Sequence, residues 1–221
     1  MQNQKVRKLV TSTMLIALGT AISFVCELIP FLNLPFGGTV TVCSLLPIIL
    51  ISWMYGPGWG FGSAFVYSIL QMAVGFKTVA ALFTPGDDSY MGSVWIALCI
   101  ILLDYILAYT SVGIGGIFRK MKNGTVALVL GSLAALFVCY LFHVLSGAIF
   151  YGEWAEWFFT DTAVANWSIS KAVMNNFSGT SLAVIYSFVY NGCYMIPEMV
   201  ITSVGAAAVS ALPMIKKADE E

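Results

Sequence analysis

Long apolar runs with almost no charge constrain this chain more than any other feature. A helix that crosses the hydrocarbon core of a bilayer takes about 20 residues. Six runs approach or exceed this length, at about 10–29, 40–54, 60–76, 94–118, 126–150 and 182–212. Only helices and closed barrels satisfy their backbone hydrogen bonds inside a membrane, and barrel strands alternate apolar with polar residues, which these runs do not. The sequence therefore predicts an all-α integral membrane protein, a six-transmembrane-helix bundle.

The composition excludes an ordinary soluble domain. Of 221 residues, 59% are hydrophobic and 10% are charged, against about 25% charged in typical soluble proteins. No repeat or low-complexity segment interrupts the chain, so residues 1–221 are predicted to form a single membrane domain. The net charge of −1 gives no electrostatic reason to expect a nucleic-acid partner. The five cysteines are scattered singly, which predicts neither a zinc site nor a disulfide framework.

The basic residues predict an orientation, because cytoplasmic loops are enriched in Lys and Arg. Six spans would place three segments on one side of the membrane, and these segments hold eight of the ten basic residues: Lys5, Arg7, Lys8, Arg119, Lys120, Lys122, Lys216 and Lys217. Both termini are therefore predicted to be cytoplasmic. The connections 31–39, 77–93 and 151–181 are predicted to lie outside.

Four ionisable residues fall inside the predicted spans, where each charge costs on the order of 2.5–3.5 kcal/mol. At 1.5 Å of rise per residue from the outer ends, Asp104 lies roughly 15 Å deep and His143 roughly 10 Å deep. Glu27 is near the outer end of its helix and is expected to reach the interface. Glu198 follows Pro197, which should kink the last helix, and is expected to bond the backbone groups that the kink frees.

Polar groups from three predicted helices converge at a similar depth in the outer leaflet. His143, Gly147 and Tyr151 are spaced i, i+4 and i+8 and share one helix face. Gly147 leaves room beside the imidazole, and Tyr151 places a ring above it. On the last helix, Tyr186 and Asn191 lie roughly 6 and 14 Å down. A carboxylate, an imidazole, an amide and several rings together predict a ligand pocket that is open to the outside.

Other interpretations of Asp104 and His143 stay open at this point. The two side chains could pair only with each other and so tie two helices together. A metal site is disfavoured, because one His and one Asp are too few ligands. A catalytic dyad is disfavoured as well, since no nucleophile motif accompanies the pair. No enzymatic activity, metal or cofactor is therefore predicted.

Four collinear stretches are similar to one family of vitamin-uptake proteins. They are Pro35–Val42 with Leu46–Ile48, Leu102–Ala108, His143–Tyr151, and Tyr186–Asn191 with Tyr194–Pro197. Together these stretches resemble the thiamine-specific S-components of energy-coupling factor transporters. The resemblance implies six helices, cytoplasmic termini and a multi-pass protein in the plasma membrane of a prokaryote. It also implies that thiamine is bound from the outer side without chemistry on it.

The resemblance further implies partners and site residues. The family works with a transmembrane coupling protein and a pair of cytoplasmic ATPases. Ala17 and Ala21 form a small-x-x-x-small pattern, which allows close helix approach and resembles the family's contact with the coupling protein. The family's ligand contacts carry over onto Asp104, Tyr105, His143, Gly147, Tyr151, Tyr186 and Asn191, and Tyr67 matches a position where some members have tryptophan. An S-component for another small vitamin or a pyrimidine precursor is the alternative.

The chemistry of thiamine fits the same residues. Its thiazolium ring is a permanent cation that Asp104 can neutralise, and desolvated aromatic faces attract such a cation by ~2 kcal/mol or more. Asn191, His143, Tyr186 and Tyr151 can supply hydrogen bonds and a stacking ring to the aminopyrimidine. The sequence contains no Walker A motif, so any energy from ATP must come from a partner.

Overall fold

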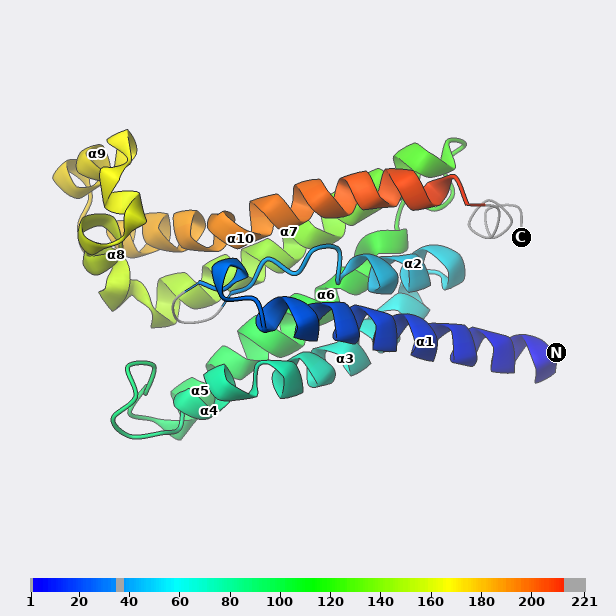
Figure 1. The fold of residues 1–221 in the computed structure, drawn as a ribbon, viewed down its shortest axis with the longest axis horizontal. Coiled ribbons are helices and arrows are strands. Elements are labelled where there is room, and N and C mark those ends of the chain that lie inside the picture. Colours follow the sequence, from blue (N-terminus) through cyan, green and yellow to red (C-terminus); the bar gives the residue numbers. More distant parts are fainter. Residues whose placement is uncertain (1, 35–37, 213–221) are drawn as a thin grey trace.

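The computed structural model describes residues 2–34 and 38–212, which form an elongated bundle of helices (Figure 1). Its α-helices are α1 (Gln2–Glu27), α2 (Leu46–Tyr55), α3 (Pro57–Val74), α4 (Phe76–Ala81), α5 (Val94–Ile100), α6 (Ala108–Ser111), α7 (Gly124–Phe150), α8 (Ala155–Asp161), α9 (Ser168–Asn176) and α10 (Gly179–Ser210). Single turns of 3₁₀-helix are η1 (Pro30–Leu32), η3 (Val112–Gly116), η4 (Gly152–Trp154) and η5 (Ala163–Asn166), and η2 (Ile101–Leu107) is a π-helix. The prediction of an all-α fold is confirmed for these residues.

Four helical segments are long and apolar enough to cross a membrane. They are Gln4–Glu27, Val94–Gly116, Gly124–Phe150 and Gly179–Ser210. Each corresponds to a predicted span. The other two predicted spans correspond to α2, which is apolar but only 10 residues long, and α3, with 18 residues. The number of spans and the side on which the termini lie stay predictions.

Several predicted boundaries are wrong. The span predicted over 40–54 begins only at Leu46, because Val42 and Cys43 have positive φ angles of 35° and 68°, which are incompatible with a helix. The span predicted over 94–118 ends at Gly116. Along its length the helix changes from α (α5) to π (η2), back to α (α6) and finally to 3₁₀ (η3). Helices also occur in two of the predicted outer connections, where α4, α8 and α9 lie.

The predicted last span starts earlier than expected and runs through its proline. α10 begins at Gly179 and continues past Pro197, although a proline inside a helix removes one backbone hydrogen bond. α7 begins at Gly124, where the side chain of Asn123 accepts a hydrogen bond from the backbone N–H of Val126 at 3.0 Å. This side chain satisfies one of the free donors at the helix start.

The core of the bundle surrounds the short helix α2. Ile48, Ile49 and Ile51 have no exposed surface, and every residue of α2 from Leu46 to Trp53 is buried. The outer surfaces of the long helices are apolar instead, as the 68% exposure of Met14 on α1 illustrates. Such a surface suits contact with lipid, because lipid tails do not penalise exposed apolar side chains.

The two ends of the bundle differ in composition. At one end lie the start of α1, the turn between α2 and α3, and the end of α10 (Figure 1). The Lys8 ammonium lies 4.2 Å from the centre of the Trp59 ring there, and Arg119 donates to the carbonyl oxygen of Met54 at 3.2 Å. The opposite end carries α4, α8 and α9. Of the eight basic residues predicted to be cytoplasmic, Lys216 and Lys217 lie outside the described residues.

Candidate functional site

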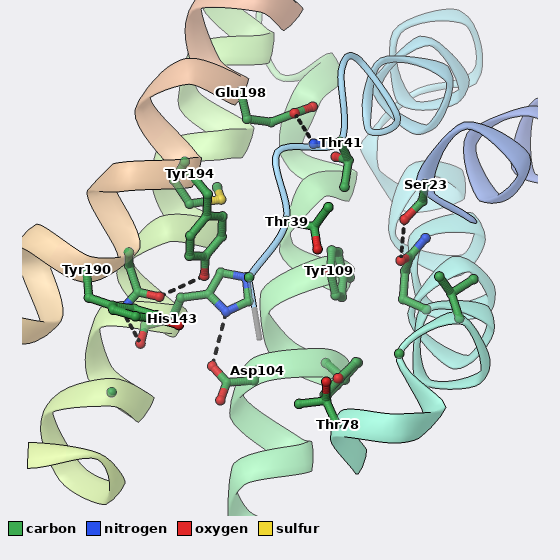
Figure 2. A pocket seen from close by; sticks show the side chains of 18 of the residues that line it. Ser23, Thr39, Thr41, Thr78, Asp104, Tyr109, His143, Tyr190, Tyr194 and Glu198 are labelled. Carbon is green, nitrogen blue, oxygen red and sulfur yellow. Dashed lines mark hydrogen bonds and ion pairs between the residues drawn. The ribbon is translucent and has the colours of Figure 1, made fainter. Parts of the chain in front are cut away.

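A cavity lies in the half of the bundle near α4 and α8, among α1, α3, η2, α7, α10 and the connection after η1 (Figure 2). It holds about 1160 Å³ of empty space, including the open space at its mouth. Small-ligand pockets usually pair apolar walls with a few converging polar groups. This cavity has both, since Leu45, Leu82 and Ile100 lie beside carboxylates, hydroxyls and amides.

Asp104 and His143 meet in the cavity wall. Asp104 lies on η2 and His143 on α7, and their Oδ1 and Nδ1 atoms are 3.0 Å apart. Ser146 donates a second hydrogen bond to Asp104 Oδ2 at 2.7 Å. The pairing that the sequence left open as an alternative is therefore present. Both side chains also line the cavity, and the Asp104 side chain keeps 21% of its surface exposed there.

Two tyrosine rings enclose the imidazole of His143. The ring of Tyr109 on α6 lies 5.9 Å from it at 78°, and the ring of Tyr194 on α10 lies 5.9 Å from it at 68°. Edge-to-face geometry of this kind stabilises aromatic pairs. The imidazole is thus fixed between two helices, with its Nδ1 directed at the carboxylate.

Asn191 joins α10 to α7 on the same side. Its Nδ2 donates to the carbonyl oxygen of His143 on α7 at 3.3 Å and to that of Ser187 on α10 at 2.9 Å, and the Tyr194 hydroxyl donates to its Oδ1 at 2.7 Å. Gly147 permits this close packing, because a Cβ at Gly147 would collide with the Ser187 hydroxyl oxygen and lie 3.1 Å from Asn191 Nδ2. Gly147 therefore leaves room for α10 as well as for the cavity.

Glu198 lies at the upper edge of the cavity in Figure 2, and its role differs from the one predicted. Its Oε2 accepts the backbone N–H of Thr41 at 3.0 Å, and its Oε1 accepts the Thr202 hydroxyl at 3.1 Å. The expected bonds to backbone groups near Pro197 are therefore replaced by a bond to the connection between α1 and α2. Glu27 also faces the cavity, where its Oε2 accepts the Thr39 hydroxyl at 2.8 Å.

The structure brings together seven of the eight predicted ligand contacts in the lining of this cavity: Asp104, Tyr105, His143, Gly147, Tyr151, Tyr186 and Asn191. Tyr67 is not among the lining residues. It has no exposed surface, and its ring packs edge-on against Tyr109 at 5.8 Å. Its hydroxyl donates to Ser44 Oγ at 3.3 Å. Through its contact with Tyr109, Tyr67 supports a cavity residue from behind.

The chain matches the family model described as thiamine transporter protein over residues 13–85 and 87–170, which is more than half of its length. It belongs to this family. The thiamine transporter ThiT of Bacillus subtilis (strain 168) is 28% identical in an alignment of 201 residues that covers 86% of this chain and 84% of that protein. The structure of ThiT from Listeria monocytogenes matches with a TM-score of 0.60 at 15% identity, over 98% of both chains, and has the same fold.

Some further cavity residues follow a helical spacing of four residues in the sequence. Tyr186, Tyr190, Tyr194 and Glu198 are spaced by four and form one stripe on α10, and all four line the cavity. Tyr109 stands four residues after Tyr105 in the same way. Residues spaced by four share a helix face, so extending the stripe from Tyr186 would have found three of these residues.

Other cavity residues had no such signal. Ser23 on α1 and Gln71 on α3 meet across 48 positions of sequence, and their hydrogen bond depends on how the two helices pack. Thr39 and Thr41 come from an irregular connection. Of the stretch Pro35–Val42 that carried part of the resemblance, Pro35, Phe36 and Gly37 lie outside the described residues.

Proposed function

We propose that this protein binds thiamine in the cavity between α7 and α10, as the substrate-binding S-component of an energy-coupling factor transporter. Membership of the thiamine transporter family supports the class. The observation that carries the proposal for this cavity is its charge. Three carboxylates, those of Glu27, Asp104 and Glu198, line it, whereas none of its lining residues in the described part of the chain is Lys or Arg.

This charge distribution favours a cationic ligand. A carboxylate held in a membrane span is expensive unless a positive partner compensates it. His143 is the only basic side chain near Asp104 among the described lining residues. The thiazolium ring of thiamine carries a permanent positive charge and can supply the remaining compensation. The rings of Tyr109 and Tyr194 beside His143 add aromatic faces that attract a cation.

The aminopyrimidine of thiamine needs hydrogen-bond partners and a stacking ring. We assign it to the side of the cavity formed by α7 and α10, where Asn191, Tyr186 and Tyr151 line the wall beside His143. Asp104 and Tyr105 on η2 then face the thiazolium. The role of Tyr67 is reduced to supporting Tyr109, because Tyr67 has no surface in the cavity.

Transport by such a protein requires partners, since the chain has no ATP-binding motif of its own. We propose that a transmembrane coupling protein and two cytoplasmic ATPases assemble with it through α1. Ala17 and Ala21 are exposed on α1, on a face that also exposes Met14 and Leu18. Small residues on an exposed apolar helix face permit close approach of another helix. Substrate binding followed by delivery, without catalysis, is the proposed activity.

The proposed topology has six spans and cytoplasmic termini in a prokaryotic plasma membrane. The end of the bundle that carries Lys8 and Arg119 is the proposed cytoplasmic end. The cavity then lies in the outer half of the membrane, where it can take up ligand from outside. α2 and α3 complete the six spans as the two shorter segments.

Calorimetric titration of the purified protein with thiamine tests the ligand. Saturable binding of one thiamine per chain, without binding of riboflavin, is expected. Binding of a bare aminopyrimidine as tightly as thiamine would favour the alternative, an S-component for a pyrimidine precursor. Absence of thiamine binding by folded, ligand-free protein would reject the proposal.

A further inference from the structure

Gln71 presents a buried hydrogen-bond donor that none of the described residues accepts. The residue lies on α3, lines the cavity and is only 5% exposed. Its Oε1 accepts the Ser23 hydroxyl at 2.9 Å, which fixes the amide against α1. Its Nε2 has no hydrogen-bond partner among the residues that the structure describes. A buried polar group without a partner destabilises the folded protein, so this donor calls for an explanation.

A role in helix packing explains only half of the side chain. The bond from Ser23 to Oε1 ties α1 to α3 and uses only the carbonyl half of the amide. The amide nitrogen contributes nothing to that bond. Gln71 borders the cavity, so its side chain forms part of the wall that a ligand would contact.

The corner around Gln71 is polar and lies away from α10. Ser23, Gly75 and Thr78 line the cavity beside it, and a Cβ at Gly75 would lie 2.8 Å from the Tyr105 hydroxyl oxygen. That hydroxyl therefore reaches the same corner. In Figure 2, Ser23 and Thr78 lie on one side of Asp104 and His143, and Tyr190 and Tyr194 lie on the other. We call Ser23, Gln71, Gly75 and Thr78 the α3 corner.

We propose that Gln71 is a specificity-determining ligand contact, and that its Nε2 donates a hydrogen bond to the hydroxyl oxygen of the hydroxyethyl arm of thiamine. The inference rests on the proposed function, which places the thiazolium at Asp104 and the aminopyrimidine against α10. The hydroxyethyl arm and the pyrimidine leave the thiazolium ring from different positions. With the pyrimidine directed at α10, the arm extends across the cavity to the α3 corner.

The chemistry of the α3 corner selects a neutral alcohol. A primary alcohol can accept the hydrogen bond from Gln71 Nε2 and donate its own hydrogen to the Thr78 or Tyr105 hydroxyl. An alkyl arm, which has no oxygen, would leave the Gln71 donor without a partner. Thiamine with its alcohol should therefore bind more tightly than an analogue whose arm ends in a methyl group.

The test is a two-by-two comparison of dissociation constants. Wild type and Gln71→Met are titrated with thiamine and with the analogue that carries ethyl in place of hydroxyethyl. One added hydrogen bond of this kind contributes about 1.4 kcal/mol, or about tenfold in affinity. Wild type should prefer thiamine at least tenfold, and Gln71→Met should lose about tenfold of that preference, because the Thr78 or Tyr105 hydroxyl can still accept a hydrogen bond from the alcohol. The ratio within each variant cancels any general effect of the substitution on folding.

A matched control is Thr110→Val. Thr110 Oγ1 is also buried without a partner among the described residues, but Thr110 does not line the cavity. The preference for thiamine should survive in this variant. If Gln71→Met does not fold, Gln71→Ala serves in its place with the same expected ratio.

Each outcome separates this inference from the proposed function. If wild type binds thiamine but does not prefer it to the ethyl analogue, Gln71 is not a contact of the alcohol and only the inference fails. The same conclusion follows if Gln71→Met keeps the full preference of wild type. If folded wild type binds neither ligand, the proposed function itself fails.

Discussion

Replacement of Asp104 by Asn separates binding of a cationic ligand from the pairing of two helices. Asp104 lies 3.0 Å from His143 Nδ1 and accepts the Ser146 hydroxyl at 2.7 Å. Asparagine has nearly the same size and keeps one oxygen acceptor, but it removes the negative charge. If thiazolium binds at Asp104, the variant holds a desolvated cation without its counter-charge.

The expected loss of affinity is large. Removal of one partner from a buried charge pair costs about 2–5 kcal/mol. At 1.4 kcal/mol for each factor of ten, this equals roughly 30-fold to several-thousand-fold in the dissociation constant. The side chain is 21% exposed in the cavity, so water screens part of the charge and the lower half of this range is expected.

Two measurements on the same variant decide between the roles: the dissociation constant for thiamine and the melting temperature without ligand. Asp88→Asn is the matched control, because Asp88 is exposed in the connection between α4 and α5 and loses the same charge. It should leave both quantities unchanged. Unchanged affinity of Asp104→Asn with a lowered melting temperature would refute the ligand role and leave only the contact with His143.

Three further predictions address the packing, the partner and the topology. Gly147→Ala should destabilise the protein by about 1–3 kcal/mol in thermal unfolding and weaken thiamine binding, because the added Cβ overlaps the Ser187 hydroxyl oxygen. Gly62→Ala is the control, because nothing lies within 4 Å of a Cβ there, and it should change neither stability nor binding. Equal behaviour of the two variants would contradict this packing argument. Ala17→Trp and Ala21→Trp should abolish co-purification with the coupling protein and keep the thiamine affinity of wild type, whereas normal assembly in both would remove these residues from the interface. A reporter fused to the C-terminus should be active only in the cytoplasm, and an extracellular signal would overturn the topology.

The long helices could be predicted from sequence because their apolar runs reflect the membrane itself. The start of α2 could not be predicted in this way. Val40 to Leu45 are apolar enough for a helix, but the backbone N–H of Thr41 bonds Glu198 and the Cys43 thiol bonds the carbonyl oxygen of Ile201. These contacts span more than 150 positions of sequence and hold the segment in a form that local pattern does not reveal.

The π-helix η2 is another feature without a sequence signal. It carries Asp104 and Tyr105, and apolar periodicity does not distinguish its wider turns from those of an α-helix. π-helical turns often occur at functional sites. The depth of Asp104 counted from α-helical rise is therefore less informative than its contact with His143, which the sequence raised only as one of its alternatives.

Part of the candidate site could be predicted from sequence because helical spacing places several of its residues on one side of a helix. His143 and Gly147 share a face of α7 and Tyr151 caps the end of this helix, so their spacing alone brings them to the cavity. Tyr67 carried the same kind of family signal but points into the core, and its position depends on packing against Tyr109. The position of Gln71 in the cavity wall depends on how α1 packs against α3, which the sequence pattern does not reveal.

The central claim, that thiamine is the ligand of this cavity, is tested most directly by identifying what the protein retains during purification. Mass spectrometry of the small molecule released from protein purified without added vitamin should detect thiamine, in a ratio to protein that falls in Asp104→Asn. Recovery of a different vitamin or of a pyrimidine from wild type, in a form that excess thiamine does not displace, would contradict the account.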